Sequence, residues 1–319
     1  MDLLDHAGFP VRLYRGVIDE QRLFASLVVK TAWTAVDGVL RLDHVQDWAV
    51  LDGPKPTPEG VLPTDQCFFK AGADLFVLGA ARSAKPVARQ RVEVRIGNTF
   101  NVQIEAIGRR VWRKRMLRAP EASEPQPFTE LPLILANAFG GSDLWDELPI
   151  PFPDNPTGTG YYISADTAID RPLPGIEDPA APIRKWDDRP EPVGVGLRPS
   201  AFGPHLRQAA EFGKDGHLSK LDPLFFNTAF PRCVVRDAKA GDAVTVRGMR
   251  VAGDWTFMLP GCPVRAEASI GGRVTPLTWR YDQMWIEPDS GRVRIAWRSP
   301  FRYTMVPLER RNVRLERVA

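Results

Sequence analysis

The chain has 319 residues and a mass of 35.6 kDa, which is length enough for about two domains and excludes a small disulfide-stapled scaffold. Hydrophobic residues make up 44% and charged residues 25%, with a formal net charge of +3, so the composition excludes wholesale disorder. The 30 prolines are about twice the usual frequency of roughly 5%. Because each proline removes a backbone donor, we expect few long helices.

The cellular compartment is predicted from three absences in the sequence. No stretch approaches the roughly 18 apolar residues of a membrane span, and residues 1–6 lack the basic and then apolar layout of a signal peptide. The cysteines, Cys67, Cys233 and Cys262, are odd in number and far apart, which argues against a disulfide framework and a zinc site. We therefore predict a cytoplasmic protein with no membrane partner.

Charge and proline divide the chain into three regions. The formal net charge is +5 over residues 1–118, −9 over residues 119–231 and +7 over residues 232–319. The middle region also holds 18 of the prolines, and 33 of the 42 basic residues are arginine, which favours planar, bidentate contacts. We predict an N-terminal antiparallel β region, a Pro-rich acidic segment packed on the sheets, and a C-terminal antiparallel β region.

The N-terminal region has the alternation of half-buried strands. Residues of one face recur at every second position of residues 23–33, all of them apolar except Thr31, which is strand periodicity. Val or Ile also alternates with charged residues over 92–96, and apolar alternation returns over 100–106. Between these runs Gly97-Asn98 predicts a two-residue hairpin turn.

The central region shows no comparable period. It contains apolar runs at residues 131–139 and 224–230, which would be costly to leave in water. We expect long ordered connections that pack over the sheets, with a short helix near residues 202–212. A connection of this length without regular structure usually signals function.

The C-terminal region repeats the strand pattern. Alternating residues 264–270 run into Gly271-Gly272, and a partner strand is predicted over residues 273–281. In the next strand Val, Ile and Trp occupy positions 293, 295 and 297, while arginines at 292, 294 and 298 are expected to face solvent. The predicted fold is mainly β, with antiparallel sandwich or barrel-like sheets at both ends and little helix. Whether these sheets form separate domains or one continuous layer stays open.

Familiar catalytic signatures are missing from the sequence. There is no G-x-S-x-G elbow, H-E-x-x-H helix, P-loop or EF-hand loop. The histidines are too scattered to suggest a metal site: His6, His44, His205 and His217. Cys67 begins an apolar run and is expected to be a buried thiol, and Asp143, Asp146 and Glu147 are expected to form a solvated acidic loop. We predict no catalytic residue, cofactor or metal.

Two other function classes stay open as alternatives. The arginine face of residues 292–298 could follow a phosphate backbone while Trp279, Trp285 and Trp297 stack on bases, as in a nucleic-acid-binding β module. The structural explanation is that these arginines maintain solubility and that Trp297 lies on the core side. The other alternative is a hydrolase acting on carbohydrate or cell-wall material, because β folds host such sites.

Several short motifs follow one another in a distinctive order. The upstream motifs are Pro63-Thr64-Asp65, Gly79 and Gly108-Arg109-Arg110-Val111-Trp112. The later motifs are Asn137-Ala138-Phe139-Gly140-Gly141, Asn155-Pro156-Thr157-Gly158-Thr159-Gly160-Tyr161, Leu173-Pro174-Gly175-Ile176-Glu177, Arg198-Pro199-Ser200-Ala201-Phe202-Gly203-Pro204, Asp222-Pro223-Leu224-Phe225-Phe226-Asn227 and Gly253-Asp254-Trp255-Thr256-Phe257-Met258-Leu259-Pro260. With this order the chain resembles the domain-of-unknown-function 2169 family, from about Val11 to Pro260. It departs from the family pattern at Cys67 and Arg109.

The resemblance implies a bacterial accessory protein of the type VI secretion system. Such adaptors or chaperones hold a toxic effector and help load it onto the tip spike, which is made of the VgrG protein and its PAAR-repeat cap. The expected partners are therefore a secretion effector and the PAAR and VgrG proteins. Candidate partner-binding anchors are aromatic residues of the central region, which could alternatively fill the core: Phe139, Trp145, Tyr161, Tyr162 and Phe202.

Overall fold

A computed structural model describes residues 1–17, 22–116, 118–198, 211–212, 218–220, 224–304 and 310–318 of the chain. These residues are mainly β, as predicted, with short helical segments at α1 (Ala165–Ala168), η1 (Leu135–Asn137) and η2 (Pro231–Cys233). Within the same ranges, no helix is both long and apolar enough to cross a membrane.

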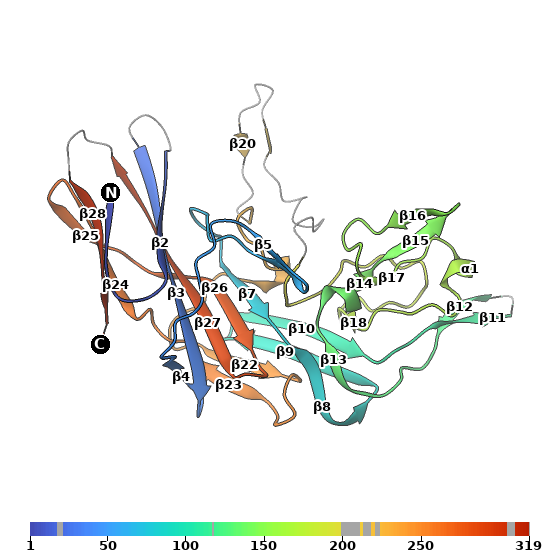
Figure 1. The fold of residues 1–319 in the computed structure, drawn as a ribbon. Helices are drawn as coiled ribbons and strands as arrows, with labels where there is room; N and C mark the ends of the chain where they lie inside the picture. Colours follow the sequence, from blue (N-terminus) through green and yellow to red (C-terminus); the bar gives the residue numbers. More distant parts are fainter. Residues whose placement is uncertain are drawn as a thin grey trace.

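The largest sheet combines strands from both ends of the chain (Figure 1). Its order is β2 (Val11–Val17), β3 (Arg22–Val36), β27 (Arg292–Thr304), β26 (Arg280–Glu287), β7 (Ala73–Val77) and β21 (Val234–Val235), with β4 (Val39–Leu42) also beside β3. The long strands β3 and β27 pair antiparallel, whereas β26 and β7 run parallel. The N- and C-terminal β regions therefore share one sheet.

Two smaller sheets mix the same two regions. The five-stranded sheet has the order β18 (Ile176–Glu177), β10 (Phe100–Ile107), β9 (Arg89–Ile96), β22 (Ala243–Arg247) and β23 (Trp255–Met258). The four-stranded sheet has the order β1 (Asp2–His6), β28 (Arg311–Arg317), β24 (Val264–Ile270) and β25 (Arg273–Pro276). In the second of these, β1 pairs parallel with the C-terminal strand β28.

The two predicted hairpins form, but the first differs at its turn and the second in the length of its partner strand. Ile96 of β9 pairs with Phe100 of β10, so the connection has three residues and the predicted two-residue turn is wrong. Gly97 begins this connection with φ 54°, a conformation that glycine adopts without a steric cost. The predicted partner strand of β24 ends at Pro276 rather than at residue 281, because the chain leaves for the large sheet, where β26 pairs with β27.

Two hydrophobic cores pack against the large sheet. Trp33, Ile295 and Trp297 contribute to the main core together with apolar residues of the five-stranded sheet. Leu27 and Val29 pack in the second core with apolar residues of the four-stranded sheet. The three sheets thus stack as layers, and the described strands leave each of them open. A sandwich-like arrangement is therefore confirmed, whereas no barrel closes among these strands.

Further short strands of the N-terminal and central regions pair with one another outside the three larger sheets. The pairs are β5 (Lys55–Thr57) with β6 (Gly60–Leu62), β8 (Ala80–Val87) with β13 (Phe128–Pro132), β11 (Trp112–Arg115) with β12 (Arg118–Ala122), β14 (Phe139–Gly140) with β17 (Thr159–Gly160), β15 (Ser142–Trp145) with β16 (Leu148–Pro151), and β19 (Glu211–Phe212) with β20 (Leu218–Lys220). The helix predicted near residues 202–212 falls outside the described residues, except that Glu211 and Phe212 lie in β19.

The described residues within 109–122 and 139–189 form a separate lobe, which we call the central lobe. It extends away from the stacked sheets, at the right of Figure 1. A small core of its own holds it together, made of Trp112, Phe139, Tyr162, Ala168, Leu173 and Ile183. The lobe is joined to the five-stranded sheet through β18, which pairs with β10.

Candidate protein-binding site and the buried ion network

The predicted aromatic anchors have different environments in the structure. Phe139 and Tyr162 are buried in the core of the central lobe, so they have the core-filling role that the sequence left as the alternative. Tyr161 is half-buried beside that core. Trp145 is exposed, and Phe202 lies outside the described residues. Of the four anchors among the described residues, Trp145 is the one that is exposed.

Trp145 belongs to a hairpin formed by β15 and β16, which carries apolar side chains into solvent. Trp145 pairs with Leu148, and Leu144 pairs with Pro149. Because directly opposite residues share a face of a hairpin, both faces are apolar. The exposed fractions are 60% for Leu144, 66% for Trp145 and 64% for Leu148. Such grouped exposed apolar residues are typical of protein-interaction sites.

The tip of this hairpin is acidic and has an unusual backbone. Asp146 and Glu147 connect the strands with φ values of 48° and 66°. Two successive positive φ angles suit a two-residue hairpin turn, where Asn and Gly are preferred. A left-handed conformation costs a residue with a Cβ about 1–2 kcal/mol. The fold therefore maintains a turn that places two carboxylates at the end of the apolar hairpin.

The base of the hairpin is fixed by a buried carboxylate. Asp143 accepts hydrogen bonds from the Ile163 backbone N–H at 2.9 Å and from the Thr167 hydroxyl at 2.7 Å. It also forms an ion pair with Arg171 at 2.8 Å. Burial alone would raise the pKa of Asp143, but these hydrogen bonds and the Arg171 charge outweigh it and lower the pKa. The prediction that Asp143 lies in a solvated acidic loop is therefore wrong. Asp143 is buried, and its hydrogen bonds hold the base of the hairpin in place. Asp146 and Glu147 are exposed, as expected.

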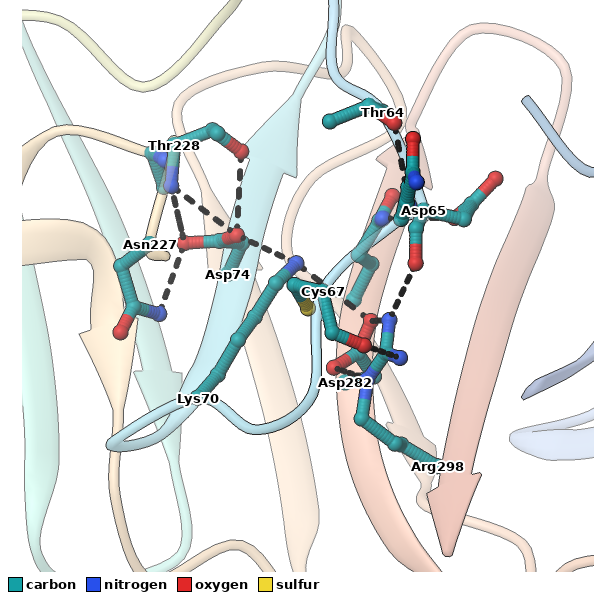
Figure 2. A network of polar contacts seen from close by, with 12 residues as sticks. Thr64, Asp65, Cys67, Lys70, Asp74, Asn227, Thr228, Asp282 and Arg298 are labelled. Carbon is teal, nitrogen blue, oxygen red and sulfur yellow. Dashed lines mark hydrogen bonds and ion pairs between the residues drawn. The ribbon is translucent and has the colours of Figure 1, made fainter. Parts of the chain in front are cut away.

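A second polar feature lies inside the large sheet. Asp282 of β26 accepts from Arg298 Nε at 2.6 Å and Nη2 at 3.0 Å, and Lys70 Nζ lies 3.4 Å away (Figure 2). Lys70 also pairs with Asp74 at 2.8 Å. Next to this group, Lys30 of β3 pairs with Asp65 at 2.7 Å. All six charged groups are buried. Because there are three cations and three carboxylates, their formal charges balance.

The buried ion network attaches two loops to the sheet. Arg298 donates to the backbone carbonyls of Cys67 at 2.6 Å and Asp65 at 2.9 Å. Asp74 accepts from the side chain of Asn227 at 3.0 Å and from the backbone N–H of Thr228, as Figure 2 shows. Since each buried charge is neutralised by a partner inside the protein, the network has the chemistry of a structural clamp.

Arg298 is the clearest correction to the sequence prediction. The alternation in β27 placed it on a solvent face with Arg292 and Arg294, yet it is buried. The reason is that β27 is an interior strand whose second face is covered by the loop containing Asp65 and Cys67. Arg292 and Arg294 are partly exposed, and pair with Asp43 and Glu287.

The structure also shows the environments of the tryptophan, cysteine and histidine residues that the sequence raised for base stacking, nucleophilic chemistry and metal binding. Trp285 and Trp297 are buried and cannot stack on bases. Cys67 is buried as predicted, and burial raises the pKa of its thiol to about 12, which keeps it protonated at neutral pH. His205 and His217 lie outside the described residues. Within the described part of the chain, no three His, Cys, Asp or Glu side chains are grouped as metal ligands.

The sequence motifs correspond to internal contacts of this structure. Arg110 and Glu177, from two of the motifs, form a buried ion pair at 2.5 Å. Asn155 donates to the carbonyl of Phe139 at 3.0 Å. A Cβ on Gly140 would lie 2.1 Å from the Asn155 carbonyl oxygen, which requires glycine there. These four motifs thus contribute internal contacts of the central lobe and of its attachment to the five-stranded sheet.

Comparison with known proteins identifies the family to which these motifs belong. The family described as "Uncharacterized protein conserved in bacteria (DUF2169)" matches residues 20–298. The chain therefore belongs to this bacterial family, which confirms the resemblance that its motifs indicated. No curated protein and no solved structure matches the chain.

Proposed function

We propose that this protein is a non-catalytic adaptor or chaperone that binds a type VI secretion effector and helps load it onto the VgrG and PAAR spike proteins. The class of partner comes from the resemblance of the motifs. The observation that carries the proposal is the exposed β15–β16 hairpin, in which Leu144, Trp145 and Leu148 face solvent on a braced base.

The hairpin has the properties of a preformed binding element. A tryptophan flanked by leucines supplies a large apolar contact area, and such residues dominate the affinity of protein interfaces. Because Asp143 holds the base in place through Ile163 and Thr167, little conformational entropy is lost when a partner binds. Both faces of the hairpin are apolar, which suits insertion between two surfaces of a partner better than contact with one flat surface.

The charge of the part of the central lobe that contains the hairpin limits the chemistry of the partner. Residues 139–189 contain ten acidic and four basic residues, and Asp146 and Glu147 extend this negative charge to the hairpin tip. Complementary charge steers association and selects among partners. We therefore expect the hairpin to enter an apolar groove bordered by lysine or arginine on the effector.

Coexpression tests the proposed function. The protein is produced with the effector and PAAR protein encoded beside it, and co-purification and effector solubility are measured. We expect a complex with the wild type, its loss with Trp145→Ala/Leu148→Ala, and its retention with Met116→Ala, which alters another exposed apolar residue of the lobe. Failure of the wild type to co-purify with either protein or to change its solubility would refute the proposal.

A further inference from the structure

A groove of about 510 Å³ opens beside the start of β26 in the large sheet. Its lining residues come from the start of β26, the neighbouring part of β27, the residues leading into β7, the residues that follow β21, and Gly261 with Cys262. Its volume lies within the range of roughly 300–1,000 Å³ that is typical of ligand sites. None of its lining residues belongs to the central lobe, so it is distinct from the β15–β16 hairpin.

The groove exposes the beginning of a strand. On one side of β26, Arg280 and Tyr281 pair with Arg298 and Trp297 of β27. On the other side, pairing with β7 begins only at Gln283. In the described residues, the first part of β26 therefore has no strand along the edge that faces the groove. Unpaired strand edges bind extended peptides through main-chain hydrogen bonds.

The side chains around this edge are basic at the rim and aromatic beneath it. Arg236, Lys239 and Arg280 line the groove and are exposed, and no salt bridge joins them to another described residue. Tyr281 and Trp297 also line it, with ring centroids 4.6 Å apart. The groove thus offers cations for carboxylates and an apolar wall for one larger side chain.

The charged groups at the back of the groove do not alter this preference. Lys70, Asp282 and Arg298 line it too, but they neutralise one another within the buried ion network. Asp237 is the one exposed carboxylate among the described lining residues. The rim therefore keeps an excess of positive charge that an anionic ligand would neutralise.

We propose that this groove binds an extended acidic peptide segment of a partner protein, which adds as a strand to the free edge of β26. Glutamate or aspartate side chains would pair with Arg236, Lys239 and Arg280, and one apolar side chain would contact Tyr281. The free strand edge favours a peptide over a nucleic acid, because a polynucleotide lacks the alternating amide donors and carbonyl acceptors of a strand. The inference goes beyond the adaptor function and does not depend on the hairpin.

Fluorescence anisotropy with a labelled heptapeptide tests this site. The probe alternates glutamate and valine around a central tryptophan, and it is titrated with the full-length protein. We expect saturable binding that weakens at least tenfold in Arg280→Glu. Arg118→Glu, which changes an exposed arginine of the central lobe, should bind like the wild type, and unchanged thermal unfolding of both variants shows that they fold.

Further probes separate the sources of binding. A lysine-for-glutamate version of the peptide should not bind the wild type, and N-methylation of alternate backbone amides should abolish binding by the acidic peptide if it adds as a strand. The inference is overturned by lack of saturable binding, by equal affinities in the wild type and Arg280→Glu, or by tighter binding of a single-stranded oligothymidine. Trp145→Ala should leave peptide binding unchanged, so failure of this site and failure of the proposed adaptor function are distinguishable.

Discussion

Replacing Asp282 by asparagine preserves the shape of the side chain and removes one negative charge from the buried ion network. The network would then hold three cations and two carboxylates. Arg298 would lose the carboxylate that accepts two of its hydrogen bonds, and Lys70 would lose its contact at 3.4 Å. Breaking a buried ion pair by removing one partner costs about 3–5 kcal/mol. Because folded domains are stable by only about 5–15 kcal/mol, we predict a large fractional loss of stability for Asp282→Asn.

Urea unfolding followed by tryptophan fluorescence measures this loss. A lower midpoint at constant m-value reports a change in stability rather than in the denatured state. Asp289→Asn is the matched control, since Asp289 forms an exposed ion pair with Arg82 and such pairs contribute less than about 1 kcal/mol. The double variant Asp282→Leu/Arg298→Met removes one charge of each sign, so its cost should be smaller than the sum of its two single costs. A cost below about 1 kcal/mol for Asp282→Asn would refute the structural role of the network.

Three further predictions concern pH and packing. Burial would raise the pKa of Asp282, but the charges of Arg298 and Lys70 outweigh it and lower the pKa to about 2. The stabilisation of the fold by ionised Asp282 should therefore be complete above about pH 5 and disappear as the pH falls from about 4 towards 2. Urea titrations at a series of pH values would detect this loss. Gly140→Ala should lower the unfolding midpoint because its Cβ would overlap Asn155, whereas Gly53→Ala, with open space around it, should not. Phe139→Ala should cost about 3–5 kcal/mol by leaving a cavity, and Trp145→Ala should change stability by less than about 0.5 kcal/mol.

Opposite results would contradict each of these expectations. A flat pH dependence between pH 5 and 2, or an equally steep one in Asp282→Asn, would show that the pKa of Asp282 is not lowered in the folded protein. Equal midpoints for the two glycine variants would show that the approach of Gly140 to Asn155 is not required. A large loss of stability in Trp145→Ala would mean that this tryptophan packs inside the protein, which would remove the basis of the binding proposal.

The strands were predictable where the sequence alternates. In residues 92–96 and 100–106 the apolar side chains recur at every second position and a glycine marks the turn, so local chemistry determines the β9–β10 hairpin. The pairing of β3 with β27 and of β7 with β26 involves residues more than 200 positions apart. No local pattern specifies such partners, so the sharing of sheets between the two ends was beyond reach.

The buried ion network was missed because alternation alone does not show which strands are covered on both faces. A useful signal was present: Lys30 follows the apolar run Leu27-Val28-Val29, and Asp282 lies two residues before the apolar run Met284-Trp285-Ile286. A lone charge beside such a run indicates a fully buried strand whose charge is paired. The exposure of Trp145 could not be predicted from the local sequence either. The position of its hairpin depends on the hydrogen bonds of Asp143, whose partners lie at least 20 residues away.

The dissociation constant of the complex with the co-purified effector tests the role of the hairpin most directly. It is measured by titration calorimetry for the wild type, Trp145→Ala/Leu148→Ala and Met116→Ala, with thermal unfolding recorded for each. We predict that the double substitution weakens binding about 100-fold, as expected when two anchors that each contribute more than about 1.4 kcal/mol are removed, while the unfolding temperature stays unchanged. Equal dissociation constants for all three proteins would show that the effector binds elsewhere.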